Sequence, residues 1–201
     1  MNILDLFAGC GGFSLGFKNA GFKIKTLIEI DKWACDTLRR NFKNSEVIEA
    51  DVKKVIKNKS LKSKLSKYDM IIGGPPCQGY SLCRRGKGEP GDPRNKLVYT
   101  FFEYVKYLKP KAFIIENVAN LYNAKNKKGE LVREVLEDET KKIGYNFYIK
   151  ILNASEFGVP QNRKRVFIIG SLKKLNDPFP KETHAINGKI NLFENLKKTP
   201  F

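Results

Sequence analysis

The alternation of short apolar runs with amphipathic stretches is the feature that most constrains the fold of this chain. Seven runs have the length of a strand, and we expect them at residues 2–7, 23–28, 46–48, 68–72, 111–115, 146–152 and 165–169. Patterns of helical period separate them, the clearest being an apolar stripe over residues 95–108. Strand, helix, strand repeated in this way predicts an α/β fold, with a mostly parallel sheet and helices on both faces.

Length and cysteine content narrow the class of protein. The chain has 201 residues, of which 41% are apolar, which is enough for one domain with a sizeable core. The longest apolar runs have strand length and the N-terminus lacks the layout of a signal peptide, so we expect a soluble, cytoplasmic protein without a membrane span. Four cysteines without a CxxC pair, and a single histidine, favour neither a zinc site nor a disulfide framework.

The charge balance points to the kind of partner. Lysine and arginine number 38 against 21 acidic residues, a formal net charge of +17. Such an excess on a small domain favours a polyanionic partner, and nucleic acid is the simplest candidate. Much of the excess is lysine, so a merely solvated basic surface stays open as the alternative.

A cysteine is held rigidly just after one of the predicted strands. Pro75 and Pro76 fix two φ angles directly before Cys77, which places the thiol at a preset position with little entropy left to lose. The strand at residues 111–115 is followed by Glu116. Two parallel strands that lead into a cysteine and a glutamate would bring a thiol and a carboxyl group to the same edge of the sheet.

A glycine-rich turn follows the first predicted strand and precedes a helix. Glycine lacks the Cβ that would block a ligand, so the turn Ala8-Gly9-Cys10-Gly11-Gly12 allows close approach to backbone N–H groups. Glu29, eighteen residues after Gly11, ends the second strand, where an acidic side chain in such folds accepts hydrogen bonds from ribose hydroxyls. By spacing alone this site could take NAD.

Together these segments resemble the cytosine-C5 DNA methyltransferases. The matching runs are Asp5-Leu6-Phe7-Ala8-Gly9-Cys10-Gly11-Gly12, Gly74-Pro75-Pro76-Cys77-Gln78-Gly79 with Ser81, Glu116-Asn117-Val118 and Gln161-Asn162-Arg163-Lys164-Arg165-Val166. The resemblance implies a Rossmann-like methyltransferase fold with a seven-stranded sheet and a catalytic domain over residues 1–170. It also implies methyl transfer from S-adenosylmethionine to C5 of a cytosine in double-stranded DNA, in a restriction-modification context.

The resemblance implies that the cofactor is S-adenosylmethionine and not NAD, and it implies which residues contact this cofactor. In the family Phe7 packs near the adenine, Glu29 takes the ribose, Asp51 bonds the adenine amino group and Leu97 contacts the cofactor. Asp51 as a helix cap and Leu97 as a core residue remain alternatives. The other expected cofactor-binding residues are Ala8, Gly9, Gly11, Gly12, Ile30, Val52 and Pro76, and Ile30 stands where the family often has an aromatic residue.

The reaction that the resemblance implies begins with a thiolate, because cytosine C5 alone is too weak a nucleophile. Cys77 would add to C6, and Glu116 would hold N3 through a shared proton. Arg165 would contact the base, Arg163 would support the site, and Asn117 would orient the loop that carries Glu116. The base must be flipped out of the duplex, and the loop at residues 81–95 would cover it as a lid or form a basic surface loop.

The last thirty-one residues depart from the family's pattern. Relatives continue past the 161–166 motif into a target-recognition domain and two further motifs, whereas residues 171–201 are predicted to form a polar tail or a partner-docking segment. We therefore expect the catalytic half of a split enzyme whose second polypeptide carries target recognition. A truncated product, an inactive DNA-associated relic and a tRNA cytosine-C5 methyltransferase are the alternatives.

Overall fold

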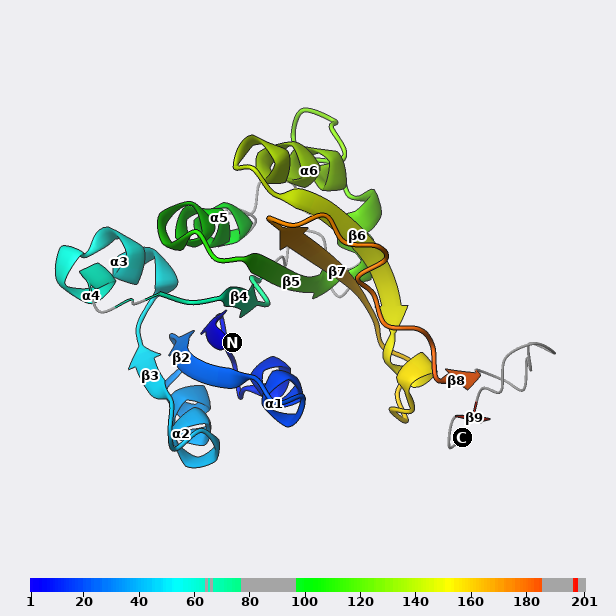
Figure 1. Cartoon of the computed structure of the whole chain (residues 1–201). Coiled ribbons are helices and arrows are strands. Elements are labelled where there is room, and N and C mark those ends of the chain that lie inside the picture. The colour runs from blue at the N-terminus through cyan, green and yellow to red at the C-terminus, as the bar shows by residue number, and fades with distance from the viewer. Residues whose placement is uncertain (64, 66, 77–96, 186–196, 199–201) are drawn as a thin grey trace.

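The computed structural model describes residues 1–63, 65, 67–76, 97–185 and 197–198 (Figure 1). The predicted nucleophile Cys77 and the predicted lid at residues 81–95 lie outside this part of the chain, and so does Cys83. No helix in the described part is both long and apolar enough to cross a membrane.

A seven-stranded sheet forms the centre of the described structure, in the order β3-β2-β1-β4-β5-β7-β6 (Figure 1). Its strands are β1 (Asn2–Leu6), β2 (Lys23–Glu29), β3 (Glu46–Glu49), β4 (Met70–Gly73), β5 (Ala112–Val118), β6 (Asn146–Asn153) and β7 (Lys164–Ser171). The first five pair in parallel, and β7 runs antiparallel between β5 and β6. The prediction of a mostly parallel seven-stranded sheet is confirmed.

Helices cover the two faces of this sheet unequally (Figure 1). One face carries α1 (Gly12–Asn19) and α2 (Lys32–Asn41). The other carries α3 (Val52–Lys57), α4 (Lys59–Ser63), α5 (Leu97–Leu108) and α6 (Val132–Lys142). The shorter elements are the 3₁₀ helices η3 (Ala119–Asn123) and η4 (Ala154–Phe157) and the strands β8 (His184–Ala185) and β9 (Lys197–Lys198), which pair in parallel.

Local sequence chemistry explains where the first two helices begin and end. Gly21, just after α1, has a φ of 84°, the left-handed conformation that glycine adopts without strain. Asp31 caps α2, because its carboxylate accepts a hydrogen bond of 2.8 Å from the backbone N–H of Ala34. The residue types at these two positions therefore account for the end of α1 and the start of α2.

The larger apolar core lies between the sheet and the helices α3, α5 and α6. Phe113 of β5 is fully buried there, and its ring meets Phe101 and Phe102 of α5 edge-on, with centroids 5.9 and 5.5 Å apart. These contacts explain the apolar stripe that the sequence placed at residues 95–108. The smaller core joins β1, β2 and β4 to α1 and α2.

The face toward α1 is only partly covered where it reaches β5 and β7. Ile115 and Ile168, on the side of α5 and α6, are buried, whereas Ile114, Phe167 and Ile169 on the opposite side are half-exposed. Of the helices in the described structure, α1 reaches them through Phe13, whose ring centroid lies 6.2 Å from that of Phe167, but the three side chains stay half-exposed. The predicted helices on both faces are therefore present, but on this face α1 and α2 pack mainly on β1, β2 and β4 and leave β5 and β7 half-exposed.

The chain after β7 returns along the sheet instead of leaving it. The backbone N–H of Leu175 donates to the hydroxyl of Tyr148 at 2.7 Å, and that of Thr183 donates to the carbonyl of Glu156 at 2.9 Å. Phe179, between these two anchors, is half-buried. The first half of the predicted polar tail is thus packed against β6 and η4.

Candidate functional site

The two segments predicted to carry the chemistry meet at the carboxyl edge of the sheet. Strand β1 pairs with β2 on one side and β4 on the other, so the strand order reverses between β1 and β4. In open α/β sheets a ligand crevice forms outside such a point. The glycine turn leaves β1 here, and the Gly74-Pro75-Pro76 segment leaves β4 beside it.

Glu29 connects the glycine turn to the end of β2. Its carboxylate accepts hydrogen bonds from the backbone N–H of Gly9 at 2.7 Å, of Ile30 at 2.7 Å and of Asp31 at 2.9 Å. Three N–H donors orient this carboxylate before any ligand arrives. The predicted contact of Glu29 with a ribose remains a prediction, and its carboxylate stands at the mouth of the turn.

Gly9 and Gly11 serve different purposes in the turn. Gly9 has a φ of 53°, and a Cβ built on it would meet no described atom within 4 Å, so the backbone is open to a ligand. Gly11 has a φ of 86°, and its Cβ would lie 2.5 Å from a ring carbon of Phe42 and 2.7 Å from a methyl carbon of Leu38. The turn therefore fits a nucleoside cofactor at Gly9, while Gly11 permits α2 to pack closely.

Replacing Gly11 by alanine should destabilise the protein by about 2–4 kcal/mol, from a left-handed backbone and an overpacked contact. Gly9→Ala should cost only about 1–2 kcal/mol, from the backbone alone, and should act mainly on cofactor binding. Urea unfolding at neutral pH measures the first effect, and titration calorimetry with S-adenosylhomocysteine measures the second. Equal losses of stability in the two variants would contradict this division of roles.

The other expected cofactor residues are spread around the same edge. Phe7 is half-buried with a φ of 61°, and Asp51 caps α3, its carboxylate accepting from the N–H of Lys53 at 2.8 Å. The cap interpretation of Asp51 is confirmed, and its adenine contact stays a prediction. Ile30 is 67% exposed. Ala8 and Val52 are buried, Leu97 opens α5 and is half-buried, and Gly12 and Pro76 are exposed.

Glu116 and Arg165 form an ion pair across two strands. Arg165 Nε lies 2.9 Å from Glu116 Oε1, with the side chains 24% and 28% exposed, respectively. Glu116 lies inside β5, so the prediction that a loop carries it is wrong. The pair forms because β7 runs antiparallel beside β5, which places Arg165 opposite Val118 and within reach of Glu116.

Asn117 connects β5 to the segment that follows β4. Its Nδ2 donates a buried hydrogen bond of 3.0 Å to the carbonyl of Pro75, and its Oδ1 accepts from the N–H of Val118 at 2.9 Å. A Cβ on Gly74 would lie 3.3 Å from Glu116 Oε2, so the chain passes close to the carboxylate on its way to Cys77. Asn117 thus holds the backbone at Pro75, and the prediction that it orients a loop carrying Glu116 is corrected, because both residues lie in β5.

Removing this bond should slow catalysis more than it weakens cofactor binding. Asn117→Ala frees the carbonyl of Pro75, and a misplacement of about 1 Å costs about 10²-fold in rate. We expect kcat to fall by about that factor while KM for S-adenosylmethionine changes little. Asn19→Ala, at the exposed end of α1, is the matched control. A variant with full kcat would show that Asn117 has no positioning role.

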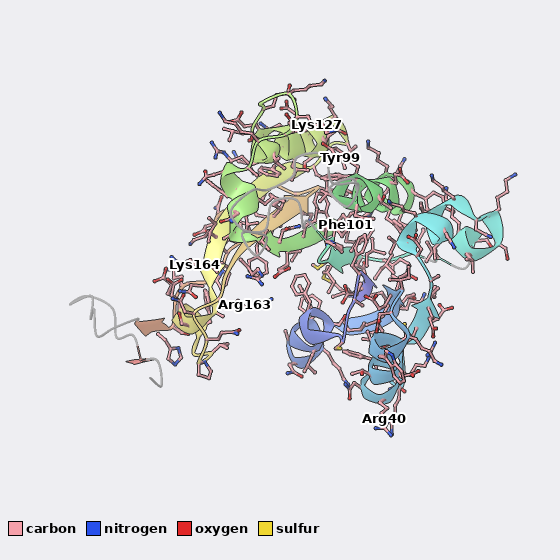
Figure 2. The ribbon with its side chains drawn as sticks, turned by 180° about the vertical axis from the view of Figure 1, so that it is seen from behind. Arg40, Tyr99, Phe101, Lys127, Arg163 and Lys164 are labelled. Atoms are coloured by element: carbon pink, nitrogen blue, oxygen red, sulfur yellow. The ribbon has the colours of Figure 1, made fainter. Side chains whose placement is uncertain are left out.

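A pocket of about 760 Å³ joins the glycine turn to the Glu116–Arg165 pair. It is lined by Asp5, Phe7, Ala8, Gly12, Phe13, Phe17, Gly74, Ile114, Glu116, Leu152, Ala154, Phe157, Arg163, Arg165, Phe167, Ile169, Pro178, Phe179 and Pro180. Figure 2 shows Arg163 and Lys164 close together at the end of the sheet that carries β7. The pocket therefore brings together residues predicted for cofactor binding and residues predicted for catalysis.

Asp5 is a member of this pocket that sequence reasoning did not single out. Burial raises its pKa from 3.8 to about 7; the charge of Glu29 adds to the shift, and a hydrogen bond from Ser14 Oγ opposes it. That bond is 2.6 Å long. Asp5 is the first residue of the run that continues into the glycine turn. The sequence pattern around it does not predict that its carboxyl group is buried, because burial depends on how α1 packs on β1.

Comparison with known proteins places these features in a family. A family model described as C-5 cytosine-specific DNA methylase matches residues 1–199. Type II methyltransferase M.DdeI of Desulfomicrobium norvegicum is 46% identical over 170 residues, which cover 85% of this chain and 40% of the relative. Type II methyltransferase M.AquIA of a Picosynechococcus species is 37% identical over 202 residues, which cover 95% and 81%.

Solved structures give the same result. A putative DNA modification methyltransferase encoded within an E. coli prophage superposes with a TM-score of 0.69 at 35% identity, over 85% of this chain and 46% of that one. The chain spans about half the length of the first curated relatives it matches. The fold, the four motifs and these matches agree, and the chain belongs to the C-5 cytosine-specific DNA methylase family.

Proposed function

We propose that this chain carries the catalytic centre of a type II DNA cytosine-C5 methyltransferase that uses S-adenosylmethionine. One observation carries the proposal. Asn117 bonds the carbonyl of Pro75, so the segment that leads to Cys77 passes directly beside the Glu116–Arg165 pair. That arrangement stands at the same edge of the sheet as the glycine turn, where Gly9 leaves room for a cofactor.

The residues of the chain divide the chemistry between them. The thiolate of Cys77 adds to C6 of the cytosine, and Glu116 shares a proton with N3, which disperses the charge that develops on the ring. Arg165 holds the Glu116 carboxylate in place from β7. S-Adenosylmethionine bound at the turn would supply the methyl group to C5. Loss of the C5 proton then allows the sulfur to leave C6, which restores the ring and the thiolate.

Access to the target supports a nucleic-acid substrate. The pocket between the glycine turn and β7 has the space for a flipped base, exposed Arg163 lines it, and exposed Lys164 lies beside Arg163 (Figure 2). These cations can contact phosphates on either side of the flipped nucleotide. The net charge of +17 favours the same kind of partner.

We further propose that a second polypeptide supplies target recognition and completes this domain. The half-exposed face of β5 and β7 supports this, because Phe13 and Phe17 of α1, Ile114, Phe167 and Ile169 line the apolar part of the pocket described above, whereas the flipped base belongs beside its polar residues Glu116, Arg163 and Arg165. Five half-exposed apolar side chains around a hollow suit the apolar face of an added helix. The match to M.AquIA also supports a short catalytic chain, since 81% of that type II methyltransferase is covered.

Methyl transfer from radiolabelled S-adenosylmethionine to mixed-sequence duplex DNA tests both proposals. The chain is assayed alone and with the product of the adjacent reading frame. Activity only with the second product supports a split enzyme, while efficient, sequence-specific activity of the chain alone contradicts it. A covalent adduct between Cys77 and 5-fluorocytosine DNA tests the chemistry separately. An adduct with 5-fluorocytosine tRNA instead would identify RNA as the substrate, and the absence of both adducts would indicate an inactive relic.

A further inference from the structure

A second pocket lies at the opposite edge of the sheet from the catalytic residues. It has a volume of about 530 Å³ and is bounded by the end of α1, the start of β2 and the segment that follows α2. Strand β2 begins there at Lys23 and ends at Glu29. Six steps of a strand span about 20 Å, so this pocket is separate from the cofactor and base site.

Positive side chains border this second pocket. They are Lys18, Lys23, Arg40 and Lys43, and none of the described residues that line it is acidic. Lys18 is engaged, because its Nζ donates to the carbonyl of Asn41 at 3.2 Å and lies 5.3 Å from the ring centroid of Phe42. The side chains of Lys23, Arg40 and Lys43 form no ion pair or hydrogen bond with any other described residue.

The partial negative charges at the ends of the two neighbouring helices are too small to balance the four cationic side chains at this pocket. The carboxyl ends of α1 and α2 both reach this pocket, and each is equivalent to about −0.5 charge. Together they offset about one of the four positive charges, and Lys18 already bonds a helix-end carbonyl. By contrast, the neighbouring Arg39 is paired with both Asp36 and Glu49. About three positive charges therefore remain without a counter-charge.

The remaining surface of the second pocket suits the organic part of a ligand. Phe22 contributes a half-exposed ring, with the buried Ile24 and Phe42 behind it, and Asn44 contributes an exposed amide. Ser45 Oγ donates to the carbonyl of Ile24 at 2.6 Å and can still accept a hydrogen bond. The volume of the pocket is in the range of small-molecule sites, about 300–1,000 Å³. We propose that it binds a phosphate-bearing small molecule of nucleotide size, with the phosphates between Lys23, Arg40 and Lys43. The separation from Glu116 favours a free ligand over the backbone of DNA bound for methylation.

Titration calorimetry with guanosine diphosphate and with pyrophosphate tests this site on the 201-residue chain. Neither probe contains the adenine that the cofactor turn is expected to accept. Saturable binding of both probes is expected, with shifts in the backbone NMR signals of residues 21–24 and 41–45. The double variant Lys23→Ala/Lys43→Ala should weaken both probes by at least about tenfold, because two charge-assisted contacts are lost.

The double variant Lys127→Ala/Lys128→Ala is the matched control. It removes the same charge from exposed positions, and Figure 2 places Lys127 at the end of the molecule opposite Arg40. Its affinity for both probes should stay within about twofold of the wild type, because long-range charge is screened by salt. Equal losses in the two variants, or no saturable binding, would refute the site. If Lys23→Ala/Lys43→Ala weakened binding of a DNA duplex but left binding of guanosine diphosphate unchanged, the cations would bind the phosphates of nucleic acid. That result would overturn the small-molecule proposal.

Discussion

Glu116→Gln is expected to lower the rate of methyl transfer by about 10³-fold, within the range that one positioned proton-transfer group contributes. The amide that replaces the carboxyl group cannot share a proton with N3 in the same way, so charge on the ring is no longer dispersed. The substitution also removes the charge that Arg165 Nε faces at 2.9 Å. Single-turnover kinetics with duplex DNA, together with the partner if activity requires one, measures the effect on the chemical step.

The loss of an ion pair by itself does not predict such an effect. The pair is about a quarter exposed, and a pair of that kind contributes about 1 kcal/mol or less to stability. Glu137→Gln breaks another ion pair, that between Glu137 Oε1 and Lys141 Nζ at 2.6 Å, on α6 and on the face of the sheet opposite α1 and the pocket. We expect this control to keep its full rate. A rate for Glu116→Gln within tenfold of the wild type would remove Glu116 from the chemistry.

Asp5→Asn is expected to remove one contribution to the pH dependence of stability, that of a carboxyl group whose pKa is raised by burial. With a pKa of about 7 in the folded state against 3.8, the folded protein keeps a proton on Asp5 that the unfolded chain has released. Stability from this group is therefore fully present below pH 3.8 and falls as pH rises toward 7. The loss amounts to about 4 kcal/mol at about 1.4 kcal/mol per pH unit.

Asparagine cannot lose a proton in this range and can still accept the hydrogen bond from Ser14 Oγ. We expect the variant to be less sensitive to pH between 4 and 7 than the wild type, and more stable than it at pH 8. Urea unfolding at pH 5, 6, 7 and 8 measures both quantities. Asp138→Asn, an exposed position on α6, controls for the change in net charge. Parallel stability curves for wild type and Asp5→Asn would mean that Asp5 titrates normally.

Much of the fold was predictable because its signals are local. Each apolar run became a strand whose ends lie within three residues of the prediction, and Gly21 lies just after α1 with the left-handed backbone that glycine adopts without strain. The sequence also predicted that the strands before Cys77 and Glu116 run in parallel toward one edge of the sheet. Strands β4 and β5 are adjacent and parallel, as that prediction requires. The role of Gly11 was only half predicted, because its contact with Phe42 joins two elements thirty-one residues apart.

Sequence alone determined the order of strands and helices, the glycine turn and the residue types of the candidate centre, because periodicity and turn chemistry act over a few neighbouring residues. Only the tertiary structure decided that β7 enters antiparallel between β5 and β6, and this pairing brings Arg165 to Glu116. It also decided the burial of Asp5, the bond from Asn117 to Pro75 and the gathering of Lys23 and Lys43 around one pocket. Each of these depends on contacts between residues distant in the chain, which packing of the whole sheet selects.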